Sequence, residues 1–148
     1  MAHFAELESK TDPTGFTSDT HLVVKRVVVI DNEHVTSDEH ADGETWCANF
    51  FGSGTWKQTS YNNNFRKQFA GIGYVYNSTK NKFLQPQPYN SWSLNSDDDW
   101  IAPVTYPSET SDKHITWDED NLRWVAVNTS NPSDSYYWDA SNTSWEDI

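Results

Sequence analysis

The amino-acid sequence predicts a mostly β protein, in which an N-terminal β-hairpin and one short α-helix are followed by a train of short antiparallel β-hairpins. Three observations predict this fold class. One early segment is dominated by β-branched side chains, the next has apolar residues at helical spacing, and the second half of the chain repeats an aromatic spacing that suits hairpins.

The strongest predicted strand covers residues 21–30, because Val and Ile favour the pleated backbone of a sheet. Its apolar side chains alternate onto both faces, so we expect both faces to be covered. A shorter, partly alternating segment at residues 2–7 precedes it, and the polar stretch 9–20 separates the two. These segments predict an N-terminal hairpin with a long loop.

One short helix is predicted near residues 44–51. Its apolar residues lie at offsets of one, four and five along the chain, as on one face of a helix: Trp46, Cys47, Phe50 and Phe51. Asp42 lies near the expected start, and Gly52 is placed to end the helix. Residues 56–70 are polar and rich in Asn, which predicts an ordered loop with few strands. We expect a helix content below about 15%.

The second half repeats a unit made of a large apolar residue, then Asn or Asp, then a second aromatic after four or five more residues. The four copies run from Tyr76 to Phe83, from Leu94 to Trp100, from Trp117 to Trp124 and from Trp138 to Trp145. Asn and Asp bond their own backbone and tolerate left-handed conformations, so each copy predicts a β-hairpin. We expect the two flanking aromatics to pair across the strands.

These elements divide the chain into two expected parts. Residues 1–70 hold the hairpin, the helix and the Asn-rich loop, and residues 71–148 hold the aromatic hairpin repeats. Proline-bearing joints separate the hairpins, because proline lacks the N–H that a strand ladder needs. Each hairpin is too short to be stable alone, so we expect it to pack against the other hairpins, against the N-terminal part or against a partner, and the partner is favoured.

The net charge of −12 excludes several classes of partner. Binding to nucleic acid or to an anionic membrane needs a basic patch, and the only basic clusters are the pairs Lys25–Arg26 and Arg66–Lys67. We therefore expect neither nucleic acid nor membrane as a partner.

Two acidic segments carry candidate metal ligands. Six candidate ligands crowd into eleven residues: His34, Asp38, Glu39, His40, Asp42 and Glu44. Their spacing fits neither a helical ligand pair nor an EF-hand loop, so a solvated acidic loop is the preferred interpretation. The run of Asp at residues 97–99 is interpreted in the same way, as a solvent-facing hairpin tip.

No catalytic motif is present in the sequence. Neither a Gly-x-Ser-x-Gly elbow, nor a phosphate-binding glycine loop, nor a His-Glu-x-x-His helix occurs. The single cysteine, Cys47, has aromatic neighbours and is interpreted as a buried thiol. We predict a non-enzymatic protein without metal or other cofactor.

Three tryptophans are candidate interface residues: Trp100, Trp124 and Trp145. Exposed Trp on hairpins stacks against sugar faces in glycan-binding modules. The alternative is that these rings pair across strands and fill a thin core, and hairpin geometry alone explains their spacing. Both interpretations stay open at this point.

The best candidate docking surface is the stretch 61–74. It carries a cationic pair in an otherwise acidic chain, flanked by aromatics: Tyr61, Phe65, Arg66, Lys67, Phe69 and Tyr74. Arg and aromatic residues are enriched in interface cores, so the pair could meet carboxylates on a partner. An internal salt bridge of this pair to Asp31 or Glu44 is the alternative.

Several stretches together carry a resemblance to a known class of proteins. They are residues 1–5, 28–32, 56–62, 65–74, 85–89 and 117–124. With them the chain resembles the small virion-associated structural proteins of marine tailed phages, especially cyanophages. The resemblance covers nearly the whole length, and the stretch 65–74 is its most specific part.

The resemblance implies a structural component of a phage virion that is made in the host cytoplasm. An accessory protein decorating the capsid is the favoured role, with the major capsid protein as its partner. A tail or tail-fibre component that contacts tail proteins is the alternative, and a module that binds a host surface glycan is the competing class. Residues 1–10 agree with cytoplasmic synthesis, because Glu6 and Glu8 interrupt any apolar leader.

Overall fold

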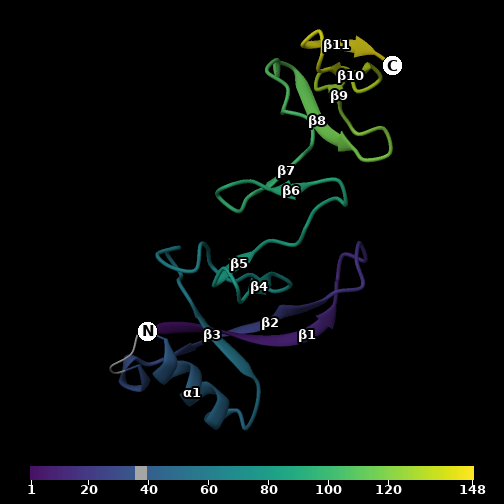
Figure 1. The fold of residues 1–148 in the computed structure, drawn as a ribbon. Helices are drawn as coiled ribbons and strands as arrows, with labels where there is room; N and C mark the ends of the chain where they lie inside the picture. The colour runs from purple at the N-terminus through teal and green to yellow at the C-terminus, as the bar shows by residue number, and fades with distance from the viewer. Residues whose placement is uncertain (36–39) are drawn as a thin grey trace. The chain divides into compact units, whose positions relative to one another are not determined.

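The computed structural model describes residues 1–35 and 40–148. Strands make up 40% of the described residues and helices 9%, which confirms the mostly β class and the low helix content. The chain forms two compact units, Met1–Pro86 and Gln87–Ile148, and each is described by itself. Figure 1 shows the order of the elements along the chain. No helix within the described ranges is long and apolar enough to cross a bilayer.

The first unit is built on a five-stranded antiparallel sheet with the order β3-β1-β2-β4-β5. Its strands are β1 (Ala2–Thr11), β2 (Thr20–Ile30), β3 (Thr55–Thr59), β4 (Val75–Asn77) and β5 (Lys82–Leu84). The predicted N-terminal hairpin is confirmed, with Ala2 opposite Ile30 and Thr11 opposite Thr20. Its loop is shorter than expected, because the Asp12 N–H donates to the Asp19 carbonyl at 2.7 Å and extends the ladder.

Helical structure comprises a 3₁₀ turn, η1 (Asn32–His34), and the helix α1 (Ala41–Phe50). The helix begins three residues before the predicted start. Asp42 and Glu44 lie in its first turn, where their negative charges interact favourably with the helix dipole. Gly52 follows its end with φ of 80°, as the sequence predicts for a terminating glycine. Cys47 is completely buried, in agreement with its interpretation as a core thiol.

Two core clusters lie in the first unit. One joins α1 to β1, β2 and β3 and contains Ala2, Phe4, Ile30, Cys47 and Trp56. The other joins β1 and β2 to the segment that follows β3 and contains Ala5, Leu7, Val24, Ala70, Tyr76 and Phe83. The second cluster explains why the sheet extends past residue 70, where the sequence suggested a boundary. Because Tyr76 pairs with Leu22 of β2, the first aromatic hairpin belongs to the first unit.

The second unit contains two antiparallel sheets. One is the pair β6 (Ser93–Leu94) and β7 (Trp100–Ile101), and the other is a meander of β8 (Lys113–Asp118), β9 (Arg123–Asn128), β10 (Ser135–Asp139) and β11 (Ser144–Asp147). Its core cluster is formed by Trp117, Trp124 and Trp138, with Tyr89, Trp92 and Trp145 packed against it. This small unit is therefore held together mainly by aromatic side chains.

All four predicted hairpins form in the predicted register. The facing pairs are Tyr76 with Phe83, Leu94 with Trp100, Trp117 with Trp124, and Trp138 with Trp145. In the three wholly aromatic pairs the ring centroids are 5.0 to 5.2 Å apart. The repeated spacing therefore encodes cross-strand aromatic pairs.

The hairpin turns share the same hydrogen-bonding pattern and the same backbone conformation. The Asn or Asp after the first apolar residue accepts a backbone N–H of the turn, as Asp118 does from Asn121 and Asp139 from Asn142. Two residues before the second aromatic, the chain adopts a positive φ in every copy: Asn81, Asp98, Leu122 and Thr143. The repeat thus specifies a turn type as well as an aromatic pair.

Candidate functional site

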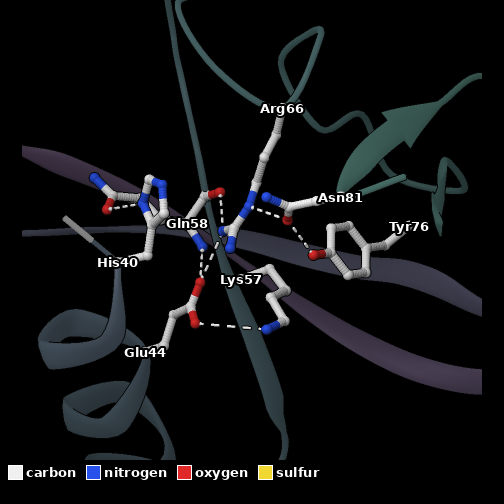
Figure 2. Close-up of polar contacts among 7 residues, drawn as sticks. All are labelled: His40, Glu44, Lys57, Gln58, Arg66, Tyr76 and Asn81. Atoms are coloured by element: carbon white, nitrogen blue, oxygen red, sulfur yellow. Dashed lines mark hydrogen bonds and ion pairs between the residues drawn. The ribbon is translucent and has the colours of Figure 1, made fainter. Parts of the chain in front are cut away.

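Arg66 is the central residue of the predicted docking stretch, and its side chain points into the first unit, to which it belongs. Its side chain is only 7% exposed, and its guanidinium donates to the Glu44 carboxylate at 2.8 Å. It also donates to the Gln58 carbonyl at 2.9 Å and to Asn81 Oδ1 at 2.9 Å (Figure 2). Of the two alternatives for Arg66, the structure contains the internal salt bridge, and Glu44 is the partner.

Glu44 is the hub of this polar network. One carboxylate oxygen accepts from both Arg66 and the Gln58 N–H, and the other lies 3.7 Å from Lys57 Nζ (Figure 2). Gln58 also contacts His40, whose Nδ1 is 3.0 Å from Gln58 Oε1. The network ties the start of α1 to β3 and to the turn after β4, so its role is structural.

The other residues of the docking stretch do not form one surface. Tyr74 packs against the core cluster around Val24, and Phe65 lies against His40 with ring centroids 4.7 Å apart. Lys67 is half-buried and has a positive φ of 71°. Tyr61 and Phe69 stay together in a cluster with a third ring, that of His3.

The cluster of His3, Tyr61 and Phe69 is the surface part of the predicted docking stretch. Tyr61 is 69% exposed and stacks on His3 with ring centroids 5.3 Å apart. Phe69 lies edge-on to both rings, at 5.6 and 5.8 Å. The sequence indicated Tyr61 and Phe69, but nothing local could show that His3, on β1, joins them.

In the second unit, two of the three candidate tryptophans line one open hollow of about 370 Å³. Its aromatic walls are Trp92, Trp100, Tyr106 and Trp124, and the remaining lining residues are Ile101, Ala102, Val104 and Thr105. A second hollow of about 550 Å³ shares Val104, Thr105 and Tyr106 and adds Trp138. Trp145 lines neither and donates its indole N–H to the Glu109 carbonyl at 2.7 Å.

Sequence reasoning missed Trp92 and Tyr106. Trp92 precedes β6 and Tyr106 lies in the joint between Pro103 and Pro107, so neither belongs to the repeated unit. The available signal was a bulky aromatic inside a proline-bearing joint. Such a ring cannot pair across strands, so it has to pack elsewhere or remain exposed, and Tyr106 is 54% exposed.

Glu119 fixes one side of the second unit. It accepts from the Ser91 hydroxyl at 2.7 Å, from the Ser91 N–H at 2.9 Å and from the Trp117 indole at 2.7 Å. These donors, with the Ser91 hydroxyl first, lower the pKa of Glu119 below its usual value. The carboxylate thereby clamps the segment before β6 to the turn after β8.

The acidic segment at residues 34–44 is only partly described, since Asp38 and Glu39 lie outside the described residues. His40 and Glu44 contact Gln58, and His34 stacks on Trp46 with ring centroids 4.4 Å apart. Within residues 1–35 and 40–148, no group of three potential metal ligands gathers closely enough to hold an ion.

Comparisons with protein-family models, with curated proteins and with solved structures gave no match to this chain.

Proposed function

We propose that this chain is a non-enzymatic structural protein of a phage virion, most specifically an accessory protein that decorates the capsid surface. The resemblance of residues 65–74 and the other stretches to virion-associated proteins of marine tailed phages gives this setting. The observation that carries the structural role is that partly buried carboxylates bond to groups within the fold and hold its segments together. Glu44 holds Arg66, and Glu119 holds Ser91 and Trp117.

The charge of the chain supports a role in many copies. Residues 87–148 contain 12 acidic and two basic side chains, a net charge of −10, whereas residues 1–86 contain ten and eight, a net charge of −2. Mutual repulsion of such acidic units keeps a protein soluble and monomeric until it meets its partner. This property suits a protein that accumulates in the host before it attaches to a shell.

Exposed aromatics offer surfaces for attachment. Tyr61, with His3 and Phe69, provides one on the first unit, and Tyr106 provides one on the second. Tyr is enriched at protein interfaces, because it supplies a large contact area and a polar tip. The favoured partner is the major capsid protein, with tail proteins second.

Immunogold labelling of purified particles tests the location. An antibody against the full chain should label the capsid faces. Label confined to the tail would select the alternative of a tail or tail-fibre component, and particles that carry no label would refute the virion setting.

A host-glycan-binding module remains the competing class, and one observation favours it: Trp100 and Trp124 line the same open hollow. Trp124 is only 7% exposed and packs in the core, so Trp100 is the better probe. If the hollow bound sugar, Trp100→Ala would abolish retention on host envelope polysaccharide while the melting temperature changed little. The capsid proposal predicts no retention of the wild-type chain.

A further inference from the structure

The hollow in the second unit has the geometry of an aromatic cage. The rings of Trp92 and Trp124 have centroids 5.9 Å apart and planes inclined by 67°. Tyr106 lies 5.0 Å from Trp124 with an inclination of 76°, and Trp100 completes the aromatic lining. Walls at such different inclinations contact an inserted group from several sides. The volume of about 370 Å³ admits a whole side chain and lies within the range of roughly 300–1,000 Å³ typical of ligand sites.

The electrostatic setting of this hollow favours a cation. The unit that contains it has a net charge of −10. Its only two basic side chains already lie over rings outside the hollow: Lys113 Nζ is 4.8 Å from the centroid of Tyr136, and the Arg123 guanidinium is 4.5 Å from that of Tyr137. The unit thus uses cation–π contacts within its own fold, and both of its basic side chains lie over rings that do not line the hollow.

We propose that this hollow is the docking site for an arginine or lysine side chain that projects from a basic surface of a partner protein. The negative field of the unit steers the positive surface toward it, and the aromatic walls hold the cation and its aliphatic stem. This inference goes beyond the virion proposal, because it assigns the chemistry of the partner's contact group and holds for any basic partner.

The lining fits a sugar less well than a cation. Sugar hydroxyls need several placed hydrogen-bonding groups, and the hollow offers the hydroxyls of Thr105 and Tyr106. The rest of its non-aromatic lining, Ile101, Ala102 and Val104, contributes aliphatic surface. The Trp124 indole N–H is already committed to the Val104 carbonyl at 2.9 Å. A second copy of this chain is also disfavoured at this hollow, since it would bring two strongly acidic units together.

The test uses the full-length chain and a capped peptide of alternating arginine and glycine. The matched probe replaces each arginine with citrulline, which keeps the shape of the side chain but removes its charge. Isothermal titration calorimetry should give binding of the arginine peptide that weakens as salt is raised, and at least about tenfold weaker binding of the citrulline peptide. Equal binding of the two peptides, or no binding of the arginine peptide at low salt, would overturn the proposal.

Variants locate the binding within the chain. Tyr106→Leu should weaken binding of the arginine peptide at least about threefold. Trp100→Leu should weaken it equally, and because Trp100 lines the first hollow but not the second, this variant shows which of the two hollows binds the peptide. Tyr106→Phe, which keeps the ring, should bind as the wild type does. Tyr61→Leu makes the same change at a comparably exposed tyrosine of the first unit and should have no effect.

Three results would contradict this assignment. If Tyr106→Leu and Trp100→Leu both kept their melting temperature and bound the arginine peptide with unchanged affinity, the peptide would be binding to the acidic surface in general and not to the hollow. Binding of a neutral oligosaccharide that is lost in Trp100→Leu would assign the hollow to a glycan. Self-association of the wild-type chain that Tyr106→Leu abolishes would assign it to a second copy.

Discussion

Arg66 and Glu44 lie 22 residues apart in the sequence and form a salt bridge of 2.8 Å, with side chains that are only 7% and 16% exposed. The pair joins the first turn of α1 to the segment that follows β3, and the Gln58 carbonyl and the Asn81 amide satisfy further guanidinium donors. A charge in this position stabilises the fold only as long as its partner is present.

Removing one partner of this pair should be strongly destabilising. Glu44→Ala leaves the Arg66 guanidinium buried without its counter-charge, and we expect a loss of about 3 kcal/mol in the free energy of unfolding. Urea unfolding monitored by circular dichroism measures it. The control is Glu8→Ala, which breaks the exposed pair of Glu8 with Lys10 and should cost less than about 1 kcal/mol. Equal losses in the two variants would contradict the structural role of the network.

Gly43→Ala should destabilise the protein although alanine is the better helix former. A Cβ at this position of α1 would overlap the ring of Phe4, which is fully buried. Overpacking costs roughly 1–3 kcal/mol, which exceeds the gain of about 1 kcal/mol from helix propensity. Asn49→Ala, at an exposed position of the same helix, should instead be neutral or slightly stabilising. Thermal melts compare the two, and a raised melting temperature in Gly43→Ala would refute the close packing of α1 on β1.

Thr143→Gly should stabilise the last hairpin. Thr143 has φ of 50°, and this left-handed conformation costs a β-branched residue about 1–2 kcal/mol. After the entropy cost of glycine, we expect a net gain of about 0.5–1 kcal/mol in the free energy of unfolding. Asn81 occupies the same turn position in the first hairpin with φ of 53°, which Asn tolerates. Its Oδ1 also accepts from Arg66 and from the Tyr76 hydroxyl, so Asn81→Gly should lose stability. A loss of stability in Thr143→Gly would contradict this turn geometry.

Local pattern was sufficient to predict the hairpins but insufficient for their assembly. Trp117 and Trp124 pair because the turn between them is encoded within a few residues, and the same holds for the other copies. The pairing of Tyr76 with Leu22 depends on two segments far apart in the chain, so the unit boundary could not be predicted. The direction of the Arg66 side chain is not predictable from local sequence for the same reason, because Asp31, Glu44 and a partner protein are all candidate sources of the carboxylate.

The candidate hollow shows the same limit. Trp100 and Trp124 were indicated by the repeat, but Trp92 and Tyr106 lie outside it and join them only after the hairpins pack. Trp145 has the same place in its hairpin as Trp124, yet it lines neither of the two hollows described above. Both indoles donate to a backbone carbonyl, that of Glu109 for Trp145 and that of Val104 for Trp124, so this hydrogen bond does not distinguish them. Position within a repeat therefore predicts the cross-strand partner of an aromatic residue, and the tertiary packing decides whether it is accessible.

Asp12 should make the stability of the first unit depend on acid pH. Its carboxylate accepts hydrogen bonds from the hydroxyl and N–H groups of Thr14 and Thr17, with the Thr14 hydroxyl the main cause, and its pKa is lowered from 3.8 to about 2. Because the folded-state pKa is depressed, this contribution is present above pH 3.8 and is lost as the pH falls toward 2. Asp12→Asn should therefore lose stability less steeply than the wild type over that interval. Urea unfolding at a series of pH values measures both slopes, and parallel curves would contradict the assignment.

The most direct test of the proposed virion role is the copy number of the chain in purified phage particles, measured by quantitative mass spectrometry against the major capsid protein. A capsid decoration protein should be present in hundreds of copies per virion. A small multiple of three or six would place it in the tail, and its absence from purified particles would contradict a structural role in the virion.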